Sequence, residues 1–387
     1  MKYAIIILTA AAGAAELIAC ASDSGIDDRG VESGDGGQDT TEPDDGGSSG
    51  EELPSVDAGA ASDAQQPLAC GDAGYCDTRL PLSNLGEPLS MRSVWAVSKT
   101  DVWSVALEGY ILHWDGTSWR VDHRVGHPLY AVRATTSSVW VGGDLGMLLR
   151  RGADGSWTSV ETGHTAPIRA IGGTSDSDMW FASRDGTVDH FDGITLTNHS
   201  LGGPVQLMTI FGDTAGGMYA AGLVQAASPE NNQPYVYALS TAAITPFNAN
   251  FSTTRGFVPI GGAVVSSPDE DPRVLLAGYK GTQLTDAFVS ASDYNEPVGR
   301  ACYTLAAPPS STEAYPNPSS SIYALSRSDV YMPCSIYQIL RWDGGKYSIH
   351  SLGMARNYLP RPIAGIHGAD GDVWMVGDGF ALKGRPL

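Results

Sequence analysis

The sequence is short of basic residues and of recognisable catalytic motifs. Only 23 lysines and arginines stand against 43 acidic residues, so the chain lacks the basic surface on which nucleic-acid binding depends. No apolar run reaches the roughly 20 residues that a spanning helix needs. The sequence also has no H-E-x-x-H pair, no phosphate-binding loop and no Rossmann fingerprint. We therefore expect no nucleic-acid partner, no cofactor and no metal.

The first 20 residues have the pattern of an export signal. Lys2 gives a basic start and residues 4–15 are almost wholly apolar. Residues 17–20, Leu-Ile-Ala-Cys, resemble the lipobox of bacterial lipoproteins, although the charge of Glu16 departs from that pattern. The resemblance implies that the signal peptide, residues 1–19, is removed and that Cys20 carries acyl chains such as palmitate, which anchor the protein to a membrane. The alternative is an ordinary cleaved signal in which Cys20 is incidental.

The lipobox resemblance also bears on location. An aspartate directly after the lipidated cysteine often retains lipoproteins at the inner membrane, and this sequence has Ala21 there. The resemblance therefore favours the outer membrane of the cell envelope, with its periplasmic and surface faces both open.

Residues 20–77 would join the lipidated cysteine to the folded domain. Residues 21–69 hold thirteen acidic residues and one base, Arg29, a net charge of −12. Such a polar segment cannot bury enough apolar surface to offset its ordering entropy, so we expect a disordered Gly/Asp/Ser-rich tether. The chain from Thr78 onward has a net charge of only −6.

Cysteine is scarce as well, with five in the chain. Apart from Cys20, Cys70, Cys76, Cys302 and Cys334 remain, an even number that favours disulfides in an exported protein. Three pairings are possible, and we prefer Cys70–Cys76 with Cys302–Cys334 because these cysteines are nearest in sequence. A zinc site is the alternative, disfavoured because there is no C-x-x-C and no nearby histidine pair.

A short unit recurs through the rest of the chain. It consists of a turn residue, an aliphatic residue and usually an aromatic residue, at spacings of 37 to 56 residues. Most spacings are near the 40–50 residues of a β-propeller blade. The units are Asp101-Val102-Trp103, Ser138-Val139-Trp140, Asp178-Met179-Trp180, Gly217-Met218-Tyr219, Arg273-Val274-Leu275, Asp329-Val330-Tyr331 and Asp372-Val373-Trp374.

The residues around each unit predict four strands. Around the first, three alternating segments are followed by the hairpin turn Asp115-Gly116 and a fourth segment that begins at Trp119. We therefore predict an all-β fold for residues 78–387, a β-propeller of seven blades with four antiparallel strands each. The last blade, residues 362–387, lacks an outer strand. We expect residues 78–90 to supply it and so to close the ring through the N-terminal strand.

The pattern over residues 101–119 resembles the repeats of secreted bacterial propeller proteins. It is similar to Asp-box, sialidase-like and kelch-like propellers. The likeness is informative for the fold and weak for function. We expect a monomeric envelope lipoprotein whose propeller is a binding or scaffold module for a protein or polysaccharide, rather than an enzyme. The alternative is a sialidase-like glycoside hydrolase or lyase, which needs two carboxylates about 5–9 Å apart beside an arginine cluster.

No catalytic residue is assigned, and the binding residues are left open. His113 and His190 occupy matching strand positions, and we interpret them as structural groups with hydrogen-bond partners. The aspartates that begin the repeated units are expected to bond nearby backbone amides. Binding is expected from long loops, at residues 226–234, 267–272 and 307–320. The arginines available for a cluster are Arg92, Arg133, Arg169, Arg300 and Arg361.

Overall fold

The structure is a computed structural model, and it divides the chain into two units, residues 1–62 and 63–387. It describes residues 70–385 except 72, 202, 214–216, 228–230, 248–255, 268–269, 281–282, 291–293, 296–301, 304–321, 327, 336–337, 344–346 and 353–362. The predicted signal segment, Cys20 and the tether up to residue 69 lie outside this part of the chain.

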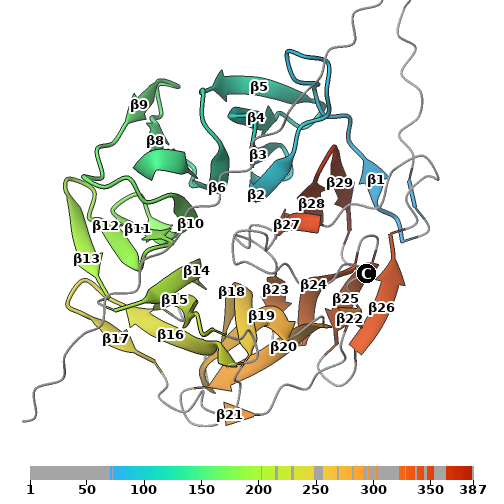
Figure 1. Cartoon of the computed structure of the whole chain (residues 1–387). Coiled ribbons are helices and arrows are strands. Elements are labelled where there is room, and N and C mark those ends of the chain that lie inside the picture. Colours follow the sequence, from blue (N-terminus) through green and yellow to red (C-terminus); the bar gives the residue numbers. More distant parts are fainter. Residues whose placement is uncertain are drawn as a thin grey trace, which may run out of the picture. The chain divides into compact units, whose positions relative to one another are not determined.

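The described residues are almost entirely β-structure. They form seven antiparallel sheets set around a common axis (Figure 1). The one helical element in this part is the 3-10 turn η1 (Asp144–Gly146). The strands are rich in valine, isoleucine and aromatic residues, which fit a pleated and largely buried surface. The prediction of an all-β propeller is therefore confirmed.

Six sheets have four antiparallel strands each. We number all sheets by the position of their innermost strand in the chain. Sheet 1 consists of β2 (Met91–Ser98), β3 (Asp101–Ala106), β4 (Tyr110–Trp114) and β5 (Trp119–Arg124). Sheet 2 consists of β6 (Leu129–Ala134), β7 (Val139–Gly143), β8 (Leu148–Arg151) and β9 (Trp157–Ser159). Sheet 3 consists of β10 (Ile168–Ser175), β11 (Asp178–Ser183), β12 (Thr187–Phe191) and β13 (Leu196–Ser200). Sheets 4, 6 and 7 are β14 (Val205–Asp213), β15 (Gly217–Val224), β16 (Gln233–Leu239) and β17 (Ile244–Pro246); β23 (Tyr323–Ser326), β24 (Asp329–Ser335), β25 (Gln338–Trp342) and β26 (Tyr347–Ser351); and β27 (Ile363–Ala369), β28 (Asp372–Gly377), β29 (Phe380–Gly384) and β1 (Cys76–Asp77).

Sheet 5 differs from the other six. It has five strands, β18 (Phe257–Ser267), β19 (Glu270–Lys280), β20 (Gln283–Ser290), β21 (Tyr294–Asn295) and β22 (Cys302–Tyr303). Two short strands, β21 and β22, pair with different ends of β20. The prediction of seven four-stranded blades is therefore wrong, because six blades have that form. The sequence of sheet 5 lacks the tryptophans and the Asp-Gly turn of sheets 1 and 3, so it does not specify where a single outer strand would begin. Sheet 4 lacks both as well but keeps four strands.

The sheets are joined by contacts between neighbouring innermost strands. In order around the axis these are β2, β6, β10, β14, β18, β23 and β27, and β27 contacts β2 again. Buried apolar clusters fill the space between sheets; one, for example, joins Trp114 of sheet 1 to Trp374 of sheet 7. All seven recurring units lie in the second strand of their sheet, so each places its third residue, aromatic in six units, between neighbouring sheets.

The ring closes through the N-terminal end of the domain, a few residues earlier than expected. Cys76 and Asp77 form β1 and pair with Lys383 and Leu382 of β29, and the Thr78 amide donates to the Ala381 carbonyl at 2.8 Å. Most of the predicted segment, residues 78–90, instead leads from β1 to β2. The closing strand β1 therefore lies before residue 78.

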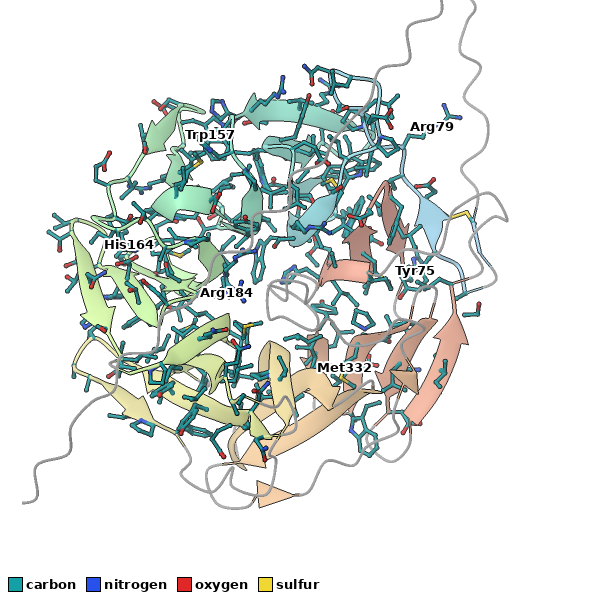
Figure 2. The ribbon with its side chains drawn as sticks, in the orientation of Figure 1. Tyr75, Arg79, Trp157, His164, Arg184 and Met332 are labelled. Atoms are coloured by element: carbon teal, nitrogen blue, oxygen red, sulfur yellow. A yellow bond between two sulfur atoms is a disulfide. The ribbon has the colours of Figure 1, made fainter. Side chains whose placement is uncertain are left out.

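Tyr75 explains why the closing strand begins where it does. Its side chain is 1% exposed and packs in the cluster that contains Tyr331 and Leu382 (Figure 2). Gly384 leaves room for the ring, since a Cβ there would lie 2.4 Å from it. The predicted Cys70–Cys76 disulfide is present directly beside this residue. The side chains of Cys302 and Cys334 lie outside the described part, so their pairing stays a prediction.

Candidate functional site

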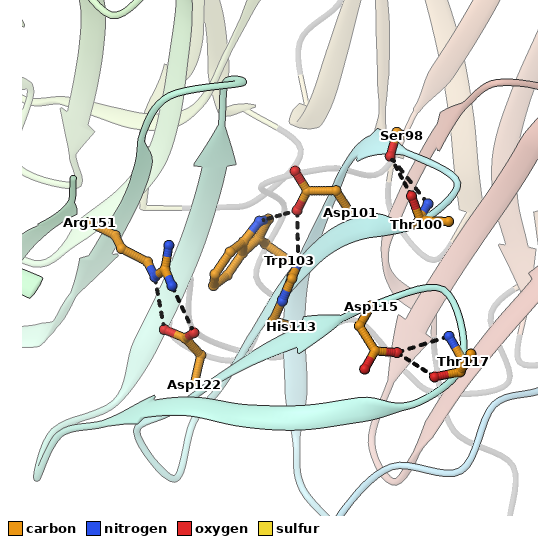
Figure 3. A network of polar contacts seen from close by, with 9 residues as sticks. All are labelled: Ser98, Thr100, Asp101, Trp103, His113, Asp115, Thr117, Asp122 and Arg151. Atoms are coloured by element: carbon orange, nitrogen blue, oxygen red, sulfur yellow. Dashed lines mark hydrogen bonds and ion pairs between the residues drawn. The ribbon is translucent and has the colours of Figure 1, made fainter. Parts of the chain in front are cut away.

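The aspartates of the repeated units organise side chains rather than backbone amides. Asp101 accepts hydrogen bonds from Trp103 Nε1 at 2.7 Å and from His113 Nε2 at 2.9 Å (Figure 3). Asp178 makes the same contacts with Trp180 and His190, at 2.8 and 2.9 Å. The expectation that these aspartates bond the backbone is wrong. Each carboxylate instead accepts hydrogen bonds from an indole two residues along its own strand and from an imidazole on the next strand. The structural interpretation of His113 and His190 is confirmed.

Backbone amides are bonded instead by the aspartates of the third-to-fourth-strand turns. Asp115 accepts from the amides of Thr117 and Ser118, both at 2.9 Å. The hydrogen bond from the Thr117 hydroxyl at 2.7 Å, together with these two backbone bonds, holds the pKa of Asp115 well below its usual range. Asp192 has the same role in sheet 3, where bonds from Thr195 and Ile194 lower its pKa to about 2. These turns are structural.

A second repeated feature lies where the innermost strands begin. A β-bulge interrupts the register near the start of six of them, and the residue within the bulge differs between sheets. Bulges re-aim side chains and recur beside functional sites. The bulged residues are Arg92, Tyr130, Arg169, Met208, Ile260 and Ala364. They are polar in sheets 1 to 3 and apolar in sheets 4, 5 and 7. We call the end of the sheets that carries them the arginine face.

The polar bulged residues interact through charge and stacking. The Arg169 guanidinium carbon lies 3.6 Å from the centre of the Tyr130 ring, a cation–π geometry. Arg92 pairs with Asp378 at 2.9 Å, and its side chain is 17% exposed. Burial raises the pKa of Tyr130, while Arg169 acts in the opposite direction, so the phenol stays protonated at neutral pH. Each guanidinium has five donors, which leaves capacity for an incoming acceptor at Arg92.

Leu145 adds an apolar group to the arginine face. It lies in η1, between the second and third strands of sheet 2, and is 57% exposed. Its φ is 54°, a left-handed conformation that costs a non-glycine residue about 1–2 kcal/mol. The turn is joined to the start of β6, since the Asp144 amide donates to the Pro128 carbonyl at 2.9 Å. A strained turn that exposes a leucine on the same face as Tyr130 indicates a binding role.

A deeper layer of side chains lies further along the same strands. In every sheet, one innermost-strand residue pairs in register with the third residue of the repeated unit. These partners are Trp95, Arg133, Gly172, Phe211, Ala263, Tyr323 and His367. Four of them form a chain of contacts: the His367 ring stacks on Trp95 at 3.6 Å and lies 5.5 Å from Tyr323, and Arg133 covers Trp95 at 3.8 Å. Arg133 also donates to the Gly173 carbonyl.

Burial in this layer lowers the pKa of its two basic groups, His367 and Arg133. Burial and the positive charge of Arg133 lower the pKa of His367 to about 3, so the imidazole is neutral at pH 7 and its Nδ1 accepts from the Ala96 amide at 3.1 Å. Burial lowers the pKa of Arg133 to about 10, where it is still charged. The layer joins five sheets and supports the arginine face above it.

The structure separates the arginines considered from sequence. It brings Arg92 and Arg169 to matching bulges with Tyr130 in the sheet between them, and it places Arg133 in the deeper layer. Arg300 and Arg361 lie outside the described residues. Sequence reasoning missed Tyr130, Leu145 and the bulges. The sequence did carry a signal for the bulged residues. In sheets 1, 2 and 3 each of them precedes the aromatic residue of the repeated unit by ten or eleven positions.

The predicted binding loops divide between the two ends of the sheets. Residues 226–234 connect β15 to β16 and therefore belong to the arginine face, where Arg184 occupies the matching turn of sheet 3 (Figure 2). The described residues of 267–272 are strand, because Ser267 ends β18, residues 270–272 begin β19, and Ser267 pairs with Glu270 at the opposite face. That interpretation as a long loop is wrong. Residues 307–320 lie outside the described part.

A metal centre and a membrane-spanning helix are both absent from the described residues. Among the described residues, no group of three or more histidine, cysteine, aspartate or glutamate side chains is arranged to hold a metal ion. No helix in the same residues is long and apolar enough to cross a membrane.

Comparison with known proteins defines the class through the fold. No family model matches the sequence, and no curated protein does. Similar solved structures include YCF48 bound to D1 peptide, at 12% identity and a TM-score of 0.55, covering 80% of this chain and 99% of that one. A catalytically inactive virginiamycin B lyase from Staphylococcus aureus with quinupristin matches at 12% identity and 0.59, covering 81% and 99%. The WD40 β-propeller domain of Doa1 matches at 14% and 0.54, covering 80% and 96%. The described chain is a β-propeller, and at these identities the likeness extends to the fold alone.

Proposed function

We propose that the propeller is a binding module that recognises a segment of a partner protein on its arginine face. The observation that carries the proposal is the asymmetry of the bulged residues: Arg92, Tyr130 and Arg169 lie on one side, beside the exposed Leu145. Arginine and tyrosine are enriched where interfaces gain most of their energy. The segment recognised would offer a carboxylate to Arg92 or Arg169 and an apolar side chain to Leu145. The peptide in the YCF48 structure supports the use of a propeller in this way.

The proposal includes the location of the protein. We propose that it is a secreted lipoprotein anchored in the outer membrane through Cys20, with residues 21–69 as its tether. The lipobox resemblance of residues 17–20 and the acidic, glycine-rich composition that follows support this. The turns built on Asp115, Asp154 and Asp192 support kinship with secreted Asp-box propellers.

Substitution of Leu145 tests the binding face without disturbing the core. Leu145→Gly relieves the positive φ, so the free energy of unfolding should stay unchanged or rise by about 1 kcal/mol. Chemical cross-linking of the full-length chain in intact cells should then recover much less partner protein than the parent. Ile194→Asn is the matched control, because Ile194 is 89% exposed in a turn on the opposite face.

The result that would overturn the proposal is equal partner recovery with both variants. A third result is the recovery of a polysaccharide in place of a protein, with recovery lost only in the Leu145 variant. It would support the arginine face as the binding site but change the class of the partner.

A further inference from the structure

A pocket lies at the opposite end of the sheets, at the seam where the ring closes. Its volume is about 600 Å³, within the range of sites for small molecules. Its lining comes from four places: the closing segment at Cys76 and Thr78, the end of the chain's last strand and the residue after it at Lys383 and Arg385, the start of β28 at Asp372, and sheet 1 at Trp114 and Thr117. The pocket therefore exists only when the N-terminal segment is in place.

The charge of the pocket is opposite to that of the domain. The charged residues in its lining are Lys383, Arg385 and one carboxylate, Asp372, which sum to +1, whereas the chain from Thr78 onward sums to −6. Lys383 Nζ pairs with Asp372 at 3.0 Å, with their side chains 28% and 17% exposed. An ammonium has three donors, so the pair leaves two for another acceptor.

The pocket lies where sheet 7 departs from the repeat. In sheets 1 and 3, the first aspartate of the unit accepts the indole N–H two residues later. In sheet 7 Asp372 is paired with Lys383, and the N–H of Trp374 has no hydrogen-bond partner. Trp374 contacts Trp114, with ring centres 5.0 Å apart. In sheet 7, Lys383 thus pairs with the aspartate that accepts the indole N–H in sheets 1 and 3. This pair lies in the lining of the pocket.

Trp114 adds an apolar wall to the pocket. It is only 6% exposed, and the ammonium of Lys383 lies 5.8 Å from the centre of its indole ring. The indole N–H has no hydrogen-bond partner, but its nitrogen is shielded from solvent, so it is not available to a molecule in the pocket. The polar contacts of a ligand here would therefore come from Lys383 and Arg385.

We propose that this seam pocket binds a small organic carboxylate, held by Lys383 and Arg385 against the apolar wall that Trp114 provides. This site is separate from the arginine face and does not depend on the function proposed for it. Because Cys76 and Thr78 line the pocket, ligand binding also stabilises the closing strand β1 by mass action.

The test uses succinate as the probe and succinamide as its neutral isostere, with calorimetry on the full-length protein. Succinate should bind and succinamide should not. Lys383→Met should weaken succinate by about tenfold or more, the value expected for one charge-assisted hydrogen bond. Lys99→Met is the matched control, since Lys99 is exposed in a turn outside the pocket lining.

Asp372→Asn separates a ligand site from a structural ion pair. It releases Lys383 from its partner and raises the pocket charge, so succinate should bind at least as tightly as in the parent. A purely structural pair would instead give the same loss of thermal stability in Asp372→Asn and Lys383→Met, with no change in succinate affinity. Absence of succinate binding, equal binding of succinamide, or full affinity in Lys383→Met would each overturn the proposal. None of these results affects partner capture by the arginine face.

Discussion

The guanidinium of Arg133 lies 3.8 Å from the centre of the Trp95 ring, and the ring of His367 stacks on the same indole at 3.6 Å. The three residues come from β6, β2 and β27, the innermost strands of three consecutive sheets. Trp95 is therefore held from both neighbouring sheets, across the point where the last sheet meets the first. This contact ties the two ends of the domain together near its axis.

Replacement of Trp95 should weaken the whole domain. Trp95→Leu removes the stacking surface for both neighbours, and the free energy of unfolding should fall by about 3 kcal/mol, typical of a large aromatic lost from a packed site. Urea unfolding followed by circular dichroism measures it. Leu85→Ala is the control, because Leu85 is 81% exposed and its loss should change little. An equal, small effect of both substitutions would contradict the packing described.

His367 should make the domain sensitive to acid. Its pKa is about 3 in the folded protein and about 6.5 in an unfolded chain. Between these values the unfolded chain binds a proton that the folded protein does not, so stability falls as the pH drops below about 6.5 and is unaffected above it. The largest slope is about 1.4 kcal/mol per pH unit.

His367→Asn tests that slope, because an amide oxygen can still accept from the Ala96 amide. Urea unfolding between pH 4 and 8 should show a flatter curve than that of the parent protein. His127→Asn controls for a histidine exposed to solvent. An unchanged slope in the His367 variant would show that other groups set the acid sensitivity.

The closing segment should be required for full stability. A chain that begins at Thr78 lacks β1 and the buried ring of Tyr75. It should unfold at a lower temperature than one beginning at residue 63, with a loss of about 3–5 kcal/mol, as for removal of a buried aromatic side chain. Thermal unfolding followed by circular dichroism compares them. Identical transitions would mean that the chain from residue 78 onward closes the ring unaided.

Lipidation should depend on Cys20 alone. Cys20→Ser should abolish incorporation of radiolabelled palmitate and move the protein from the membrane fraction to the soluble fraction. Cys70→Ser should keep the label while losing the Cys70–Cys76 disulfide. Membrane retention of the Cys20 variant would favour the alternative of an ordinary signal with another means of attachment.

The fold was predictable because the repeated unit carries its own structural information. Val102 and Trp103, like their counterparts in other units, specify a buried second strand, and Asp115-Gly116 specifies the turn that follows. The unit in sheet 5 has Leu275 in place of an aromatic residue and no such turn, so its extra outer strand was not visible. The closing strand was misplaced because Cys76 and Asp77 are only two residues, too few for a pattern, and Tyr75 revealed its role only through its packing.

The candidate site was predicted less well than the fold. A bulge is a change of register between two strands. The residues around Arg92 or Arg169 in a single repeated unit do not predict it. Leu145 looks like an ordinary turn residue until its φ of 54° and its exposure are known. The seam pocket joins Cys76 to Lys383, more than 300 positions apart, and its unpaired indole N–H groups depend on three-dimensional neighbours.

The Cys70–Cys76 disulfide also decides how mechanical load enters the domain. Any pull on the chain before Cys70 passes through the sulfur–sulfur bond directly to Cys76, so residues 71–75, including Tyr75, are bypassed. The load then reaches β1, which pairs with β29 of the last sheet. A pull on the N-terminal segment would thus arrive at the strand that closes the ring without first straightening residues 71–75.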